Sequence, residues 1–124
     1  MQQDIALAGR RILVVEDEFL VAEYLGEILR SAGAEVLGPL GRVPEALAFL
    51  RTETGPLDAV VLDVNLHGQP SFPIADELVR RGIRFVFTTG YDGGAIEPAY
   101  RAYPRCEKPF REEALLAALS PAPA

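Results

Sequence analysis

The chain has 124 residues, of which 49% are hydrophobic and 24% are charged, and its formal net charge at pH 7 is -6. This length fits one compact domain, and the composition supports a buried core and excludes a disordered chain. Direct binding to nucleic acid is not expected, because the chain is acidic and has no lysine or arginine cluster that could neutralise phosphates.

Short apolar runs alternate with helical patterns along the chain. In chain order, the predicted elements are a strand at 11–15, a helix at 18–32, a strand at 34–38, a helix at 44–51, a strand at 59–62, a helix at 73–81, a strand at 84–88, a helix at 95–102, a strand at 105–107 and a helix at 111–119. The first helix is predicted because Val21, Leu25 and Ile28 share one face at helical spacing. The helix at 95–102 has the weakest pattern, because Pro98 interrupts it.

Repetition of a strand followed by a helix predicts an α/β fold, in which helices cover both faces of a parallel sheet. Right-handed crossovers leave few topologies for such a chain. Ligands of open parallel sheets bind outside the carboxyl ends of the strands. The polar residues that end the strands are therefore candidates for one site, and they are Glu16, Asp17 and Glu18, then Asp63, then Thr88 and Thr89, and finally Lys108.

Phosphoryl transfer to Asp63 gives each of these residue types a role. Asp63 ends an apolar run, and an ionised carboxylate is costly to bury without a partner. A carboxylate can act as a nucleophile and form an acyl phosphate. Clustered acids repel an incoming phosphoryl group, and a Mg2+ ion held by two or three of them would offset that repulsion. Lysine and threonine supply an ammonium and a hydroxyl for the phosphate oxygens.

Four ordered motifs, VVEDE, VLDVNL, TTG and EKPF, each end a predicted strand. Together they resemble the receiver domain of bacterial two-component response regulators, over about residues 10–120. The resemblance implies a flavodoxin-like, doubly wound (βα)5 fold with strand order 2-1-3-4-5. It also implies Mg2+ as cofactor and the following roles: Asp63 as phosphoacceptor and metal ligand, Asp17 as direct metal ligand, the backbone carbonyl of Asn65 as a further ligand, Glu16 as a ligand through water, Thr89 as the switch hydroxyl, Lys108 as the phosphate-contacting ammonium, and Pro109 as the carrier of a cis peptide.

One position departs from the common receiver pattern. Most receivers have a tyrosine or phenylalanine three residues before the lysine, and here that position is Arg105. The stretch FVFTTGY instead resembles a subclass of single-domain receivers named FATGUY. We expect an extension at 1–10, a receiver domain at 11–120 and a tail at 121–124, with no output domain.

The function implied by the resemblance is that of a stand-alone response regulator. Asp63 would accept a phosphoryl group from a histidine kinase or a histidine phosphotransfer protein, and the signal would pass to a downstream protein by contact or by phosphorelay. Catalysis would be limited to Mg2+-dependent self-phosphorylation and slow autodephosphorylation, so the chain is not predicted to be an enzyme. The alternatives are a pseudo-receiver that binds partners without phosphorylation and, less favoured, a phosphatase with an aspartyl nucleophile, since that family has an acid where this chain has Asn65.

The remaining signals concern location and two isolated residues. No apolar run approaches the roughly 20 residues that span a bilayer, and the N-terminus lacks the features of a signal peptide. Cys106 is the single cysteine, which agrees with a reducing compartment, and we expect a cytoplasmic protein without membrane contact. Cys106 is predicted to be a small buried side chain, and His67 an exposed loop residue.

Overall fold

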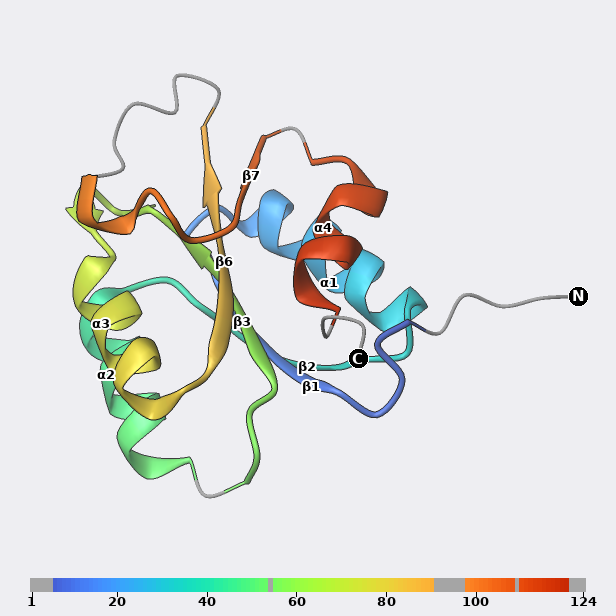
Figure 1. Ribbon diagram of the computed structural model, residues 1–124, viewed down its shortest axis with the longest axis horizontal. Helices are drawn as coiled ribbons and strands as arrows, with labels where there is room; N and C mark the ends of the chain where they lie inside the picture. The colour runs from blue at the N-terminus through green and yellow to red at the C-terminus, as the bar shows by residue number, and fades with distance from the viewer. Residues whose placement is uncertain (1–5, 54, 91–97, 109, 121–124) are drawn as a thin grey trace, which may run out of the picture.

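The computed structural model describes residues 6–53, 55–90, 98–108 and 110–120 (Figure 1). Its elements are β1 (Arg11–Val15), α1 (Phe19–Ser31), β2 (Glu35–Leu40), α2 (Val43–Thr52), β3 (Ala59–Asp63), β4 (Asn65–Leu66), β5 (Gln69–Pro70), α3 (Phe72–Arg81), β6 (Arg84–Thr89), a 3-10 turn (Pro98–Tyr100), β7 (Arg105–Glu107) and α4 (Glu112–Leu119). Among these residues, none of the helices is both long enough and apolar enough to cross a membrane.

Five of the strands form one parallel sheet in the order β2-β1-β3-β6-β7. Since β6 and β7 are the fourth and fifth strands of this sheet along the chain, the order matches the predicted 2-1-3-4-5, and the flavodoxin-like fold class is confirmed. The pairing register sets Val15 beside Leu62 and Asp63 beside Thr88. The carboxyl ends of β1, β3 and β6 therefore lie next to one another.

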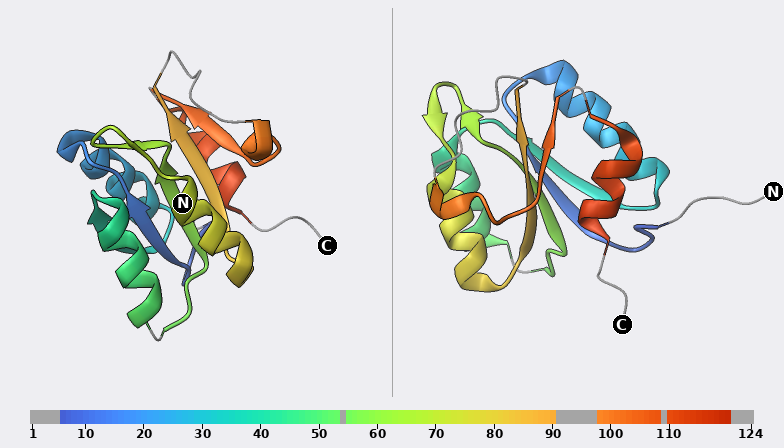
Figure 2. Two further views of the ribbon diagram at one scale, coloured as in Figure 1. Left: turned by 90° about the vertical axis from the view of Figure 1, so that its left-hand side faces the viewer. Right: turned by 45° about the horizontal axis from the view of Figure 1, so that its top comes forward.

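The sheet separates two hydrophobic cores, with α1 and α4 on one face and α2 and α3 on the other (Figures 1 and 2). Strand residues alternate between the two faces, as the pleat requires. The core on the α1/α4 face includes Val14, Val61, Val86, Cys106, Leu25, Leu29 and Leu115. The core on the α2/α3 face includes Leu13, Leu62, Phe85, Phe87, Ala46 and Leu78. Both faces of β3 are buried, which explains its unbroken apolar sequence.

The predicted elements agree with the structure within two residues at each end, with two exceptions. The first is the helix expected at 95–102. Residues 95–97 lie outside the described residues, and Pro98–Tyr100 forms a 3-10 turn followed by a further turn, so the described part of this prediction is wrong. A proline at the start of the turn cannot donate a backbone hydrogen bond and so does not continue a helix. The second exception is the β4–β5 hairpin, whose strands of two residues each are too short to show a periodic pattern.

The segment before β1 packs against the end of α1, inside the region expected to be an extension. Leu7 is fully buried in the α1/α4 core, and its N–H donates a hydrogen bond to the Ala32 carbonyl oxygen at 2.9 Å. The N–H of Gly9 donates to the carbonyl oxygen of Gly33 at 3.2 Å. Gly33 has φ +96°, and a Cβ at this position would lie 2.9 Å from the Ala8 Cα. Glycine is therefore required at 33 by both its backbone conformation and this close approach.

Candidate functional site

Lys108 joins the ends of three strands at the carboxyl edge of the sheet. Its Nζ lies 3.0 Å from Asp63 Oδ2, 3.2 Å from Glu16 Oε1 and 3.5 Å from Glu18 Oε1. Glu16 and Asp63 are buried, and the Lys108 side chain is 19% exposed. The structure thus brings together three residues that the sequence predicted for one site. Glu18 was also a strand-end candidate, and its contact with Lys108 adds a third carboxylate to the ammonium.

The carboxylates of Glu16, Asp17 and Asp63 form a compact acidic cluster. Each offers an oxygen atom, and these atoms lie within 4.8 Å of one another. Glu16 Oε1 is buried and makes no hydrogen bond within the described part of the chain; it approaches Lys108 Nζ only as an ion pair. A set of carboxylate oxygens with one unused buried acceptor suits a hard divalent cation such as Mg2+. The residues present therefore fit the predicted metal.

Burial and crowding control the charges at this site. Burial, and then the charge of Asp63 and a hydrogen bond with it, raises the pKa of Glu16 to about 8. Burial lowers the pKa of Lys108, but the hydrogen bond to Asp63 and the charges of Asp63 and Glu16 raise it by more, so the pKa of Lys108 is raised overall. The ammonium is therefore charged at neutral pH, and burial beside Asp63 disfavours ionisation of Glu16.

The β4–β5 hairpin supplies backbone donors to two of the carboxylates. The N–H of Asn65 donates to Asp63 Oδ1 at 3.0 Å, and the N–H of His67 donates to Asp17 Oδ2 at 3.0 Å. The Asn65 side chain in turn accepts a hydrogen bond from the Gly68 N–H at 2.8 Å, which closes the turn. His67 has φ +51°, in the left-handed region. Its side chain is half exposed, as expected, but its backbone holds a predicted metal ligand in place.

Thr88 and Thr89 end β6, and consecutive strand residues point to opposite faces of the sheet. Both are buried, at 0% and 4% exposure. Thr88 pairs in register with Asp63 on one side and with Cys106 on the other. The carbonyl oxygen of Thr89 accepts a hydrogen bond from the Lys108 N–H at 2.8 Å, so Thr89 is tied to the start of the segment that carries the ammonium.

Sequence reasoning placed Glu16, Asp17, Asp63, Thr89 and Lys108 at the carboxyl edge of the sheet, and all five lie there. It did not assign Glu18 a contact with the ammonium, or His67 a contact with Asp17. A two-residue hairpin strand leaves no periodic signal from which the position of His67 could be predicted. Pro109, the expected site of a cis peptide, lies outside the described residues.

The fold of this chain is shared with proteins of known structure. The chain is similar to SdrG from Sphingomonas melonis Fr1, with 39% identity, a TM-score of 0.79 and coverage of 92% of this chain and 97% of that one. It is also similar to the BeF3-activated conformation of SdrG from Pseudomonas melonis Fr1, with 36% identity, a TM-score of 0.74 and coverage of 96% and 98%. A response regulator receiver protein from Burkholderia phymatum, 23% identical with a TM-score of 0.76, shares the fold over 93% of this chain and 99% of that one.

Similarity extends to a curated relative by sequence. The transcriptional regulatory protein PdtaR of Mycobacterium tuberculosis is 33% identical over 78 residues, which are 63% of this chain and 37% of PdtaR. The chain thus matches little more than a third of the length of that relative. No family model matches the chain. The extended likeness to SdrG, together with the sheet order and the acidic cluster facing a lysine, shows that the chain belongs to the receiver domains of response regulators.

Proposed function

We propose that this receiver accepts a phosphoryl group on Asp63 and passes the signal on by protein contact or phosphorelay. The observation that carries the proposal is the 3.0 Å contact between Lys108 Nζ and Asp63 Oδ2 beside the acidic cluster. The two oxygens of Asp63 have separate donors, the Asn65 N–H and the Lys108 ammonium. These donors orient the carboxylate towards the open carboxyl edge of the sheet.

The transfer step forms one bond and breaks another. A carboxylate oxygen of Asp63 bonds to phosphorus as the N–P bond of a donor phosphohistidine, or the O–P bond of an acyl phosphate, breaks and leaves its electron pair on the donor. Lys108, already in contact with Asp63 Oδ2, would pair with a phosphoryl oxygen, and the Thr89 hydroxyl would donate to another. Both groups act by holding charge in place.

Asp17, Asp63 and the backbone carbonyl of Asn65 would hold Mg2+, with Glu16 acting through water. The bound ion would offset the repulsion between these carboxylates and the phosphoryl group. The chain's own part is to present Asp17 through the His67 N–H at 3.0 Å and Asp63 through the Asn65 N–H at 3.0 Å. Both contacts come from the same hairpin, so the two ligands are positioned together.

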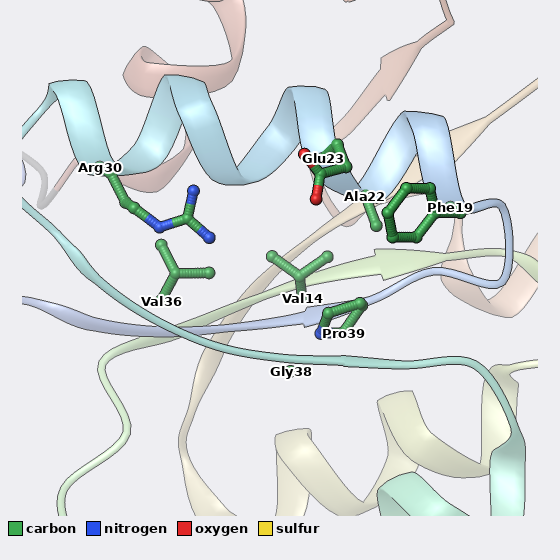
Figure 3. A pocket seen from close by; sticks show the side chains of 8 residues that line it. All are labelled: Val14, Phe19, Ala22, Glu23, Arg30, Val36, Gly38 and Pro39. Atoms are coloured by element: carbon green, nitrogen blue, oxygen red, sulfur yellow. The ribbon is translucent and has the colours of Figure 1, made fainter.

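Partner proteins are expected to dock beside the site, on the first turn of α1. Phe19 is 70% exposed and Leu20 is 78% exposed, immediately after the acidic end of β1. Figure 3 shows the Phe19 ring beside Ala22 and Pro39, at one end of a small hollow between α1 and β2. A histidine kinase, a histidine phosphotransfer protein or a downstream target would cover these apolar side chains. A cytoplasmic location follows from this role, and membership of the FATGUY subclass stays a prediction.

The test is labelling of the protein by a small-molecule acyl phosphate in the presence of Mg2+, followed by intact-protein mass spectrometry. We expect one phosphoryl group per chain, no label on Asp63→Asn, and none after the metal is chelated. Asp76→Asn, a matched change on the exposed side of α3, should label normally. Undiminished labelling of Asp63→Asn would contradict the proposal.

The two alternative functions give different outcomes in the same assay. A pseudo-receiver would remain unlabelled and would capture the same partner with and without the acyl phosphate. A phosphatase would release inorganic phosphate from a separate phosphomonoester over many turnovers, whereas the proposed receiver releases only its own phosphoryl group, slowly. A pulldown with and without beryllofluoride would identify partners that distinguish the two states of Asp63.

A further inference from the structure

Thr88 has a hydroxyl that no contact in the structure explains. The residue is fully buried, and its Oγ1 has no hydrogen-bond partner among the residues that the structure describes. A buried hydroxyl without a partner costs free energy, and valine would fill the same volume without that cost. The surroundings of Thr88 therefore point to a partner that this hydroxyl reaches in another rotamer or in the phosphorylated state.

The sheet register shows which residues this hydroxyl can meet. Asp63, Thr88 and Cys106 are paired across β3, β6 and β7, so their side chains share one face. Cys106 and Val86, which is two residues before Thr88, both belong to the α1/α4 core. Thr88 therefore lies on the α1/α4 side of the sheet, directly beside the Asp63 side chain. The side chain of Thr89, the expected switch hydroxyl, leaves the strand on the opposite face.

Lys108 must cross the end of β6 to reach Asp63. It follows β7, and β6 lies between β7 and β3 in the sheet. The ammonium nevertheless contacts Asp63 Oδ2 at 3.0 Å and Glu16 Oε1 at 3.2 Å. Thr88 is the residue of β6 that stands in register between Asp63 and the strand leading to Lys108. Thr88 is thus the β6 residue next to the ion pair on which the proposed transfer depends.

We propose that Thr88 is a positioning residue for the Asp63 carboxylate. A threonine hydroxyl both donates and accepts, and each carboxylate oxygen can accept more than one hydrogen bond. Rotation about the Thr88 side chain would let the hydroxyl donate to Asp63 beside the existing Lys108 donor, fixing the carboxylate for attack. This inference rests on the proposed function of Asp63. It adds a second hydroxyl, separate from Thr89 and on the other face of the sheet.

The test compares Thr88→Val, which keeps the shape and removes the hydroxyl, with Thr88→Ser, which keeps the hydroxyl and removes a methyl group. The rate of labelling by a small-molecule acyl phosphate with Mg2+ and the melting temperature are measured for both. We expect Thr88→Val to label about ten- to a hundredfold more slowly, the loss of one hydrogen bond to a charged carboxylate, with an unchanged or higher melting temperature. Thr88→Ser should label at nearly the wild-type rate and melt at a lower temperature, because it leaves a small cavity.

The opposite pattern assigns Thr88 to packing alone. If Thr88→Val labels as fast as wild type, or if the rate falls in Thr88→Ser in step with the melting temperature, the positioning role is wrong while the function of Asp63 stands. Labelling of Asp63→Asn at the wild-type level has a different meaning. It would overturn the proposed phosphoacceptor, and the proposed role of Thr88 would be wrong as well. Asp63→Asn is therefore run beside both Thr88 variants.

Discussion

At the scale of single residues, the site is defined by acids that are close together and partly removed from water. Glu16 and Asp63 are 3% and 5% exposed, and Lys108 is the cation in contact with both. Burial first, and then the nearby charge of Asp63, raises the pKa of Glu16, and the single ammonium offsets this only in part. The site without metal is therefore under electrostatic strain, and its stability should depend on pH and on cations.

The pKa of Glu16 gives the sign of that dependence. Its folded-state pKa of about 8 lies above the ordinary glutamate value of 4.5, so its contribution to stability is complete below about pH 4.5 and is lost as pH rises through 8. We expect the free energy of unfolding of the metal-free protein to fall between pH 5 and pH 8.5, and Glu16→Gln to flatten this fall. Urea denaturation in a chelating buffer measures both curves. Parallel curves for wild type and Glu16→Gln would show that Glu16 is not responsible.

Asp17→Asn separates metal binding from folding. The substituted amide oxygen can still accept the His67 N–H, which now bonds Asp17 Oδ2 at 3.0 Å, so the hairpin contact survives. One negative charge fewer weakens Mg2+ binding and relieves repulsion in the metal-free protein. We expect a lower affinity in a Mg2+ titration followed by NMR, with an unchanged or higher melting temperature. Unchanged affinity would remove Asp17 from the ligand set, and a markedly lower melting temperature would make its role structural.

These residues differ in how far sequence could predict them. Asp63 was predictable because it directly follows a short apolar run, and Lys108 because it directly follows a predicted strand; parallel strands bring such ends to one edge. The contacts of Glu18 and His67 depend on a helix start and on a left-handed turn, which residue order alone does not fix. The family resemblance favours Thr89 over Thr88 as the switch hydroxyl, and sequence does not show that the Thr88 hydroxyl lacks a partner.

At the scale of elements, long periodic segments were predicted well and short ones were not. The segment after β6 illustrates the reason. Tyr100, in the 3-10 turn, stacks on Phe72 with ring centroids 4.4 Å apart and donates a hydrogen bond to Asp76 at 2.6 Å. Tyr103 packs on Phe85 at 5.1 Å. Contacts with residues distant in sequence thus determine the local structure, and helical propensity does not. An aromatic cover on this side of the sheet is present although Arg105 occupies the usual aromatic position.

Leu7 shows how a short segment can contribute to the core. It is fully buried against the end of α1, although the sequence predicted a domain that begins at residue 11. We expect Leu7→Ala to lower the free energy of unfolding by about 2–5 kcal/mol, as for other buried leucines. Leu20→Ala, the same change at a position that is 78% exposed, should stay within about 0.5 kcal/mol of wild type. Equal effects in urea denaturation would mean that the segment before β1 does not stabilise the fold.

At the scale of the whole molecule, phosphorylation of Asp63 should rearrange the segment from Thr89 to Ala102. A phosphoryl group offers acceptors that Thr89 and Lys108 reach by drawing the strand ends inward. Charge-assisted contacts contribute roughly 1.5–3 kcal/mol each, enough to change the population of a short segment. Tyr100, near the end of this segment, stacks on Phe72, the first residue of α3. The response should therefore extend to the start of that helix.

Amide hydrogen exchange with Mg2+ and beryllofluoride tests this response. We expect altered protection at residues 90–102 and at the first turn of α3, and no change when the same additives are mixed with Asp63→Asn. Changes confined to the neighbours of Asp63 would show that this segment is not an output surface. A change confined to α1 would instead place the output on the face that carries Phe19.

The path of Lys108 across β6 also affects the outer strand. β7 has three residues, lies at the edge of the sheet and pairs with β6 alone among the described strands. The contact between Lys108 and Asp63 thus links this short edge strand to the central strand β3 and stabilises its position. Replacing Asp63 with neutral asparagine weakens that contact, so the variant used as an unlabelled control should also exchange its Lys108 amide proton faster, since the Lys108 N–H donates to the Thr89 carbonyl oxygen at 2.8 Å. The amide exchange rate at the end of the edge strand β7 therefore reports whether Asp63 is charged.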